Sequence, residues 1–205
     1  MKVLTVLVPT YNVEKYLRRC LDSLLLPEVL EEIEVLVVND GSKDGSADIA
    51  RAYEKKYPQT VVFVDKENGG HGSTINVGIE KAQGTYFKVL DSDDWVNIGD
   101  FIEFVKRLKE ETADGKKYNL NEIDLNILHG EYFMMATTTY RTEVLRASGL
   151  KMLEKTFYVD MQYNIVPITK VDTFAYYHLD IYRYFIGRKD QSMNMDNFVR
   201  NQEHH

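Results

Sequence analysis

Residues 86–95 read YFKVLDSDDW, a short apolar strand pattern that runs directly into three carboxylates within four residues. The apolar part suits a buried strand, whereas an unpaired buried carboxylate costs on the order of several kcal/mol. The strand must therefore deliver Asp91, Asp93 and Asp94 to an open edge of a sheet or to cations. Aspartate is common in loops that follow strands, but that tendency does not account for so dense a cluster of like charges.

The chemistry of this acidic segment favours a hard divalent cation. Carboxylate oxygens suit Mg²⁺, Mn²⁺ or Ca²⁺, whereas Zn²⁺ or copper would call for nearby His and Cys ligands, which the segment lacks. Mg²⁺ typically binds one or two protein carboxylates and completes its coordination shell with water and substrate phosphates. The segment therefore predicts a site for a nucleotide diphosphate together with Mn²⁺ or Mg²⁺.

The residues upstream of this segment alternate between strand and helix patterns. Apolar, β-branched runs predict buried strands at residues 3–8, 33–38 and 61–64. Apolar residues at helical spacing predict intervening helices at residues 13–26, 47–57 and 73–83. With the strand before Asp91, the order is β-α-β-α-β-α-β. It predicts an α/β fold with a Rossmann-like, doubly wound, mostly parallel sheet and helices on both faces.

Polar residues follow three of the predicted strands, at residues 10–12, 39–42 and 91–94. In open α/β sheets, ligands bind beyond the carboxyl ends of the strands, where the strand order reverses. We therefore expect these three groups to converge on one ligand-binding edge.

Composition and length predict a single domain over residues 1–205, with a nucleotide-binding half at 1–97 and a second-substrate half at 98–205. The chain is 44% hydrophobic and 28% charged, which is typical of a soluble globular domain. The net charge of −7 argues against broad nucleic-acid binding, which needs a basic surface. No apolar run has the length of a transmembrane segment, the N-terminus lacks a signal-peptide pattern, and Cys20 is the single cysteine. We expect a cytoplasmic protein.

Four segments resemble family 2 glycosyltransferases, the large group of inverting sugar transferases with the A-type fold. They read VLVPTYNVEKYLRRCLDSLL, IEVLVVNDGSKDGS, ENGGHGSTINVGIEKAQGTYFKVLDSDDW and FYVDMQY, and the first three cover most of residues 3–95. The resemblance implies a metal-dependent, hexosyltransferase-like enzyme. Its partners would be a nucleotide-diphospho-sugar donor and a carbohydrate or lipid-linked saccharide acceptor. It also implies a role in cell-surface polysaccharide synthesis, in the cytoplasm or at the inner face of the membrane.

The resemblance also implies roles for individual residues at the nucleotide site. Thr10 and Tyr11 would line the base and ribose pocket, Asp40 would hydrogen-bond the base, and Asp91 would reach the ribose. Farther along the chain, Arg188 and Ser192 lie in a segment that resembles the family's basic loop over the diphosphate. An ordinary exposed basic turn is the alternative interpretation of that segment.

Metal binding and catalysis are assigned to three further acids by the same resemblance. Asp93 would be the principal metal ligand of the aspartate-any-aspartate motif, with Asp94 as its support or as a helix cap. Asp160 would be the general base that deprotonates the acceptor hydroxyl, since an inverting displacement needs one placed carboxylate opposite the leaving group. The alternative for Asp160 is a favourable acid at a helix N-terminus. Val159 replaces the glutamate that often precedes this base.

The third predicted loop departs from the family pattern. Many members carry Ser-Ala-Ala-Arg-Asn where this chain has residues 72–76, so Ile75 stands in place of a basic residue. His71 is the nearest substitute, either as a contact to the donor or as a local hydrogen-bonding residue. The chain also passes directly from residues 112–117 into Tyr118, where the family has a longer excursion on the acceptor side.

The second half has less regular patterns, with strands predicted at residues 132–140, 171–177 and 180–185 and a short helix from Asp160 to about residue 165. Two other functions stay open on the residues alone. A nucleotidyltransferase would need a basic, glycine-rich loop near the N-terminus, which VLVPTYNVEKY lacks. A binding module without turnover would retain Asp40 and Asp93.

Overall fold

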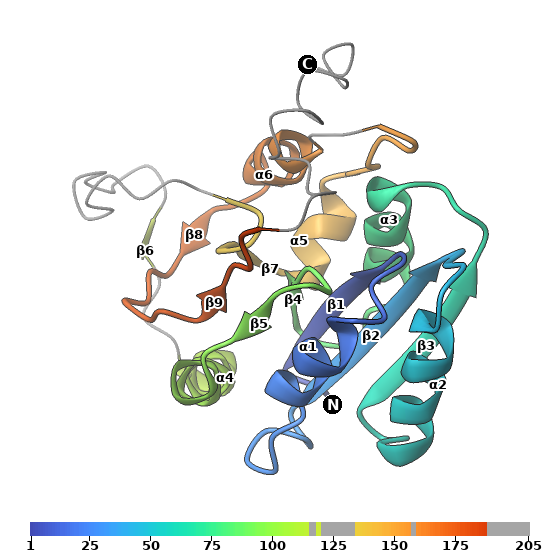
Figure 1. Ribbon diagram of the computed structural model, residues 1–205. Coiled ribbons are helices and arrows are strands. Elements are labelled where there is room, and N and C mark those ends of the chain that lie inside the picture. The colour runs from blue at the N-terminus through green and yellow to red at the C-terminus, as the bar shows by residue number, and fades with distance from the viewer. Residues whose placement is uncertain (115–117, 120–133, 157–158, 188–205) are drawn as a thin grey trace.

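The computed structural model describes residues 1–114, 118–119, 134–156 and 159–187 of the chain. Its first half alternates strands and helices: β1 (Leu4–Thr10), α1 (Leu17–Leu24), β2 (Ile33–Asp40), α2 (Ser46–Lys56), β3 (Val61–Lys66), α3 (His71–Lys81) and β4 (Tyr86–Val89) (Figure 1). The second half contains β5 (Trp95–Val96), α4 (Ile98–Asp114), β6 (Tyr118–Asn119), β7 (Thr139–Arg141), α5 (Thr142–Ala147), α6 (Asp160–Ile168), β8 (Thr173–Phe174) and β9 (Tyr182–Arg183).

The central sheet has the strand order β3-β2-β1-β4-β7. The first four strands are parallel to one another, and β7 pairs antiparallel with β4. Two short antiparallel pairs, β5 with β9 and β6 with β8, lie outside this sheet. The predicted mostly parallel α/β sheet is therefore confirmed, and the strand order reverses between β1 and β4, as ligand-binding α/β sheets require.

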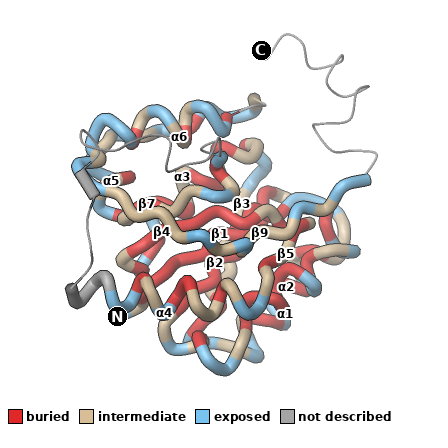
Figure 2. The backbone as a smooth tube through the Cα atoms, turned by 90° about the vertical axis from the view of Figure 1, so that its left-hand side faces the viewer, coloured by how far each residue is buried: buried red, intermediate tan, exposed pale blue. Residues whose placement is uncertain are grey.

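Helices cover both faces of the sheet. Buried side chains of α1, α2 and α4 pack with Leu4, Val6 and Val8 on one face, and those of α3, α5 and α6 pack with Leu7 and Phe87 on the other. The central strands form the most deeply buried part of the chain (Figure 2). Burial on both faces explains why these strands read as continuous apolar runs.

Strand β3 lies at an edge of the sheet, and side chains of α2 cover part of that edge. The backbone N–H of Phe63 points away from β2 and donates to Oε1 of Glu54 at 2.8 Å. Close by, Arg51 pairs with Asp65 at 2.7 Å. Helix α2 thus supplies one hydrogen-bond partner that a further strand would otherwise provide, and a charged pair beside it.

Several element boundaries differ from those the sequence predicted. Helix α1 begins at Leu17 and not at residue 13. The backbone N–H of Val13 donates to the hydroxyl of Ser46, the first residue of α2, and that of Glu14 donates to Asp44 in the loop before it. Helix α6 continues to Ile168, past the end expected at residue 165. Among the described residues no helix is long and apolar enough to cross a bilayer.

The strands of the second half are shorter than predicted. Of the expected strand at 132–140, the described residues 135–137 form a turn, and β7 contains only the last part. The hydroxyl groups of Thr137 and Thr138 both donate to the carbonyl of Met134, which favours a turn over an extended chain. The strands expected at 171–177 and 180–185 are reduced to the two-residue β8 and β9.

Candidate active site

An open cleft of about 2260 Å³ runs along the carboxyl ends of the parallel strands. Seven of the residues singled out in the sequence line it: Thr10, Tyr11, Asp40, His71, Asp91, Asp93 and Asp160. They come from the ends of three strands and the starts of two helices. Asp94 is buried and does not line the cleft, and Arg188 and Ser192 lie outside the described residues.

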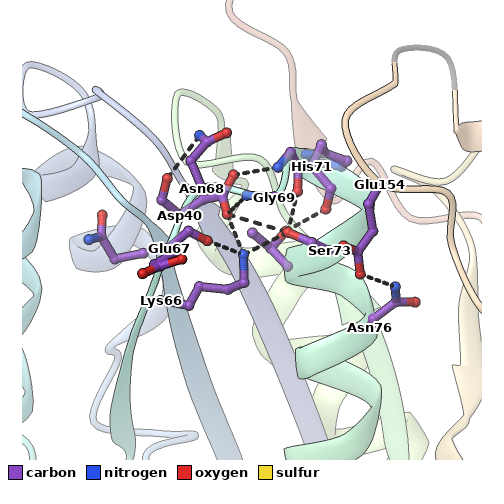
Figure 3. A network of polar contacts seen from close by, with 12 residues as sticks. Asp40, Lys66, Glu67, Asn68, Gly69, His71, Ser73, Asn76 and Glu154 are labelled. Carbon is purple, nitrogen blue, oxygen red and sulfur yellow. Dashed lines mark hydrogen bonds and ion pairs between the residues drawn. The ribbon is translucent and has the colours of Figure 1, made fainter.

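Asp40 ends β2 and anchors the loop that leads into α3 (Figure 3). Its buried carboxylate accepts hydrogen bonds from the backbone N–H groups of Gly69 and Gly70 at 2.9 and 2.8 Å. The ammonium group of Lys66 adds a third bond at 2.6 Å. Both carboxylate oxygens are thus engaged by the protein, so Asp40 fixes the wall of the cleft on this side.

The same glycine loop is also the contact surface for the second half of the chain. Gly70 has a φ of 84°, and a Cβ atom there would lie 2.9 Å from the backbone nitrogen of Lys155. A Cβ atom on Gly72 would lie 2.0 Å from the carbonyl oxygen of Leu153. Two hydrogen bonds between Asn76 and the backbone of Met152 extend this contact. The glycines therefore allow residues 152–155 to pack directly on the start of α3.

Thr10 and Tyr11, at the end of β1, differ in their exposure. The hydroxyl group of buried Thr10 donates to the carbonyl of Val8 at 3.1 Å, so its side chain supports the turn of the chain. Tyr11 is 50% exposed and presents its ring at the cleft. An exposed ring beside a polar edge suits contact with a planar base.

Asp94 connects the acidic loop to the C-terminal part of the described chain. Its buried carboxylate accepts a hydrogen bond from the hydroxyl of Tyr182 at 2.5 Å and another from the backbone N–H of Phe185 at 2.7 Å. Burial raises the pKa of Asp94 to about 6. The hydroxyl of Tyr182 also accepts a longer bond, at 3.4 Å, from the N–H of Asp91. One tyrosine from β9 therefore touches both ends of the acidic loop.

Asp91 experiences the charges of the other acids in the cleft. The surrounding protein raises its pKa first by desolvation, and the carboxylates of Asp93 and Asp160 raise it further. His71 acts in the opposite direction, with its Nε2 atom 4.0 Å from a carboxylate oxygen of Asp91. Acids from β4 and from α6 therefore face one another across a single cleft, although they are far apart in the sequence.

The backbone of Asp93 is held by an aromatic and cationic stack. Arg19 of α1 donates to the carbonyl of Asp93 at 2.8 Å, and its guanidinium lies 3.8 Å from the centre of the Trp95 ring. The centre of the Phe185 ring lies 4.8 Å from the same guanidinium. The planar contacts reduce the freedom of Arg19 and so fix the loop that carries Asp93.

The donor set around Asp93 fits a divalent cation that shares its ligands with a substrate. In the described part of the chain, no three His, Cys, Asp or Glu side chains are arranged to hold a metal ion by themselves. Asp93 nevertheless faces an open cleft beside the charge of Asp91. Mg²⁺ and Mn²⁺ are typically held in this way, by one or two carboxylates and the phosphates of a nucleotide.

Asp160 is the first residue of α6, and neighbouring residues fix the helix that carries it. The side chain of Gln162 bonds the backbone of Leu153 and of Lys151 at 3.0 and 2.8 Å. Tyr163 is fully buried in the core beside Leu7 and Phe87. Asp160 itself is exposed at the cleft, where an incoming hydroxyl group can reach it.

The sequence interpretation missed two residues of the cleft. Tyr182 was one of a dense run of aromatic residues, and nothing in that run distinguished it from its neighbours. Lys88 lies in the middle of β4 and is 2% exposed. A lysine inside an apolar strand was a usable signal, because lysine is almost never fully buried without a partner.

The chain is similar to several known proteins. The family model described as "Glycosyl transferase family 2" matches residues 5–183. Glycosyltransferase GlyA of Streptococcus pneumoniae is 37% identical over 138 residues, which are 63% of this chain and 19% of GlyA. Minor teichoic acid biosynthesis protein GgaB of Bacillus subtilis is 37% identical over 122 residues, 59% of this chain and 13% of GgaB.

A solved structure supports the same family. Residues 1–349 of TarS from S. aureus, in complex with UDP-GlcNAc, superpose with a TM-score of 0.62 and 25% identity over 82% of this chain and 52% of TarS 1–349. The chain thus spans about a fifth or less of GlyA and GgaB and about half of this TarS structure.

Proposed function

Because this chain belongs to glycosyl transferase family 2 and has the A-type fold, we propose that it transfers a sugar from a nucleotide-diphosphate donor to a hydroxyl group of an acceptor. The family model matches most of the chain, so membership does not depend on one motif. Inversion at the anomeric carbon, the use of a metal ion and the roles of individual residues are part of the proposal.

One observation carries this proposal: Asp91 and Asp93 meet Asp160 in one cleft at the carboxyl ends of the parallel strands. A metal ligand and a general base must lie on either side of the same anomeric carbon. We propose that the loop after β4 and the start of α6 supply these two groups, and the packing of residues 152–155 against the glycine loop and α3 supports this arrangement.

The proposed cation site consists of Asp93 and the phosphates of the donor. When held there, Mn²⁺ or Mg²⁺ neutralises charge on the departing diphosphate. Asp94 has a different task in this proposal, since its carboxylate already accepts two hydrogen bonds from residues 182 and 185. It holds the acidic loop in place, and Asp93 lines the cleft.

The proposed reaction is a single displacement with inversion. An oxygen of the acceptor forms a bond to the anomeric carbon as the bond between that carbon and the diphosphate oxygen breaks. Asp160 takes the proton of the attacking hydroxyl group, and the nucleoside diphosphate leaves. The exposed position of Asp160 at the start of α6 supports this role.

Recognition of the nucleotide is assigned to the first half of the chain and to a segment outside the described residues. Tyr11 would contact the base, and Asp91 the ribose. The contact between Asp40 and the base remains a prediction beside its observed role as a loop anchor. Arg188 and Ser192 are proposed to bind the diphosphate.

The similarity to GgaB supports an acceptor of the cell-surface polysaccharide class. TarS is solved with UDP-GlcNAc, so uridine and N-acetylglucosamine are the first base and sugar to try.

Binding of the donor is tested with a thermal-shift panel of UDP, GDP, CDP and dTDP, each with and without Mn²⁺. A ligand that binds only the folded state raises the melting temperature. At a hundredfold excess over its Kd, the ligand increases the apparent free energy of unfolding by about 2.7 kcal/mol. We expect one nucleotide to act, and to act more strongly with Mn²⁺. A panel without any response would contradict the proposal.

Turnover is tested by release of nucleoside diphosphate from nucleotide sugars that carry the base identified by the panel. Asp93→Ala should abolish release and the effect of Mn²⁺ on binding, whereas Asp160→Asn should abolish transfer and leave donor binding within about twofold. Asp48→Ala is the matched control, because Asp48 is 89% exposed and lies outside the cleft. Full transfer activity in Asp160→Asn would remove that residue from the mechanism.

A further inference from the structure

Among the residues that the structure describes, Lys88 is a buried cation without a carboxylate partner. Its residue is 2% exposed, and within the described chain its ammonium group has one hydrogen-bond acceptor, the carbonyl of Ala136. The ring of Tyr182 lies 5.9 Å from the same nitrogen. Burial alone lowers the pKa of Lys88 to about 8. An ammonium group has three donors, so two of them have no acceptor within the described chain.

Thr139 provides a second unsatisfied polar group beside Lys88. The two residues are directly opposite in the antiparallel pair of β4 and β7, so their side chains lie on the same face of the sheet. The hydroxyl oxygen of Thr139 is buried and has no hydrogen-bond partner among the described residues. Buried hydroxyl groups are normally paired, and an unpaired hydroxyl beside an ammonium group with unused donors points to an acceptor supplied by a ligand.

Arg141 extends this face by one position. It lies opposite Tyr86 in the same strand pair, and its guanidinium is 5.0 Å from the centre of the Tyr86 ring. In the part of the chain that the structure describes, Arg141 makes no ion pair with a carboxylate of another described residue. Lys88, Thr139 and Arg141 all line the cleft that also contains Asp91 and Asp160.

The position of this face separates it from the proposed diphosphate site. Lys88 precedes Asp91 by three residues, which is about 10 Å along a strand. Lys88 lies on β4, and Thr139 and Arg141 lie on the neighbouring strand β7. Strand β1 separates β4 from β2, which ends at Asp40. The cleft volume of about 2260 Å³ also exceeds the roughly 300–1,000 Å³ of a usual small-molecule site. There is room for a second substrate beside the donor.

We propose that Lys88, Thr139 and Arg141 form an anion-binding subsite that takes a carboxylate or phosphate group carried by the acceptor. The inference rests on the proposed glycosyl transfer, because it assigns part of the same cleft to the second substrate. Lys88 and the hydroxyl of Thr139 donate hydrogen bonds to the anion, and Arg141 adds charge at its outer side. An acidic sugar or a phosphate-linked acceptor would then be preferred over a neutral one.

Direct binding of small anions tests the subsite in the absence of a known acceptor. The probes are D-glucuronate for a carboxylate and glycerol 3-phosphate for a phosphate ester, with D-glucose and glycerol as matched neutral compounds. All melting temperatures are measured with EDTA and at constant ionic strength. We expect at least one anionic probe, and neither neutral one, to raise the melting temperature of the wild-type chain.

Variants decide whether the response belongs to Lys88. Lys88→Met keeps the length of the side chain and should lower the affinity for the anionic probe about 10- to 100-fold. Thr139→Val should lower the same affinity about 3- to 10-fold. Lys2→Met is the matched control, because Lys2 also donates to a carbonyl, that of Leu30, but lies outside the cleft. It should bind the probe like the wild type.

The nucleotide panel is repeated on each variant, so that failure of the subsite is distinguished from failure of the proposed function. Lys88→Met should keep the response to nucleotide and Mn²⁺. The subsite is overturned if neither anion stabilises the wild-type chain, if Lys88→Met responds to the anions like the wild type, or if that variant loses the nucleotide response as well. A response to only one of the two probes supports the subsite and identifies the group it takes.

Discussion

At the scale of single residues, Lys88 has an energetic consequence that is separate from ligand binding. Its pKa falls from 10.5 to about 8 on folding, so the folded state holds the ammonium form less favourably than the unfolded chain does. The difference corresponds to about 3 kcal/mol of stability that is lost wherever the group is charged in both states. That condition holds below pH 8.

We therefore expect Lys88→Met to raise the free energy of unfolding at pH 7, by about 1–3 kcal/mol in urea denaturation. Between pH 8 and 10.5 the folded lysine has already lost its proton while the unfolded one retains it, so the wild-type chain gains stability and the advantage of Lys88→Met shrinks. A destabilised variant at pH 7 would show that the bond to Ala136 outweighs the cost of burial.

Tyr182 carries a second prediction at this scale. Tyr182→Phe removes the hydroxyl that bonds Asp94 and leaves the buried carboxylate with the backbone N–H of Phe185 as its remaining described donor. We expect a loss of about 1–3 kcal/mol in the free energy of unfolding, because a buried acceptor is left partly unsatisfied.

Tyr184→Phe is the control for this change, since Tyr184 is 50% exposed. If both variants unfold at the same urea concentration, the bond between Tyr182 and Asp94 contributes nothing measurable to stability.

At the scale of elements, two glycines in equivalent helix positions should respond oppositely to the same substitution. Gly72 and Gly99 are each the second residue of a helix, in α3 and α4. A Cβ atom on Gly72 would lie 2.0 Å from the carbonyl oxygen of Leu153, whereas on Gly99 the nearest atom, from Asn97, is 3.7 Å away. Gly72→Ala must therefore displace residues 152–155, and Gly99→Ala displaces nothing.

We expect Gly72→Ala to lower the free energy of unfolding by about 1–3 kcal/mol. Gly99→Ala should raise it by about 0.5–1 kcal/mol through helix propensity. Thermal or urea denaturation measures both, and the sugar-transfer assay should show a loss only for Gly72→Ala, since residues 152–155 precede the helix of Asp160. Equal stability of the two variants would contradict the close contact at Gly72.

The elements differ in how well the sequence predicted them. Strands β1, β2 and β4 were readable because burial on both faces leaves a continuous apolar run, and the helices between them because loops with Pro, Gly and Ser mark their ends. The run of threonines before β7 was misinterpreted as a strand. Threonine favours strands, but here local hydroxyl bonds to Met134 form a turn.

The candidate site was predictable where acids cluster in the sequence, and less so where it depends on long-range contacts. The density of carboxylates at 91–94 was sufficient to place the cleft. The task of Asp94 was not, because its partner Tyr182 is 88 residues away in the chain. Likewise, no local pattern reveals that Asp40 is saturated by the loop at 69–70.

At the scale of the whole molecule, the two halves share one cleft, and a cation should couple them only when a donor is present. In the described chain, no set of three ligands holds a metal without a substrate. We expect EDTA to abolish transfer and to weaken nucleotide binding, and Mn²⁺ or Mg²⁺ to restore both.

The urea midpoint of the free protein should stay within experimental error in EDTA, because no described part of the fold depends on the cation. A large drop in that midpoint would indicate a structural metal. Transfer at full rate in EDTA would remove the cation from the proposed reaction.

The edge of the sheet at β3 has a consequence for the behaviour of the protein at high concentration. An uncovered edge strand offers unpaired N–H and C=O groups to any other chain, and strand addition of this kind begins aggregation. Glu54 already occupies the N–H of Phe63, and the ion pair of Arg51 with Asp65 places charge along the same edge. A second molecule would have to break these contacts before adding a strand, so α2 protects the chain against self-association through β3.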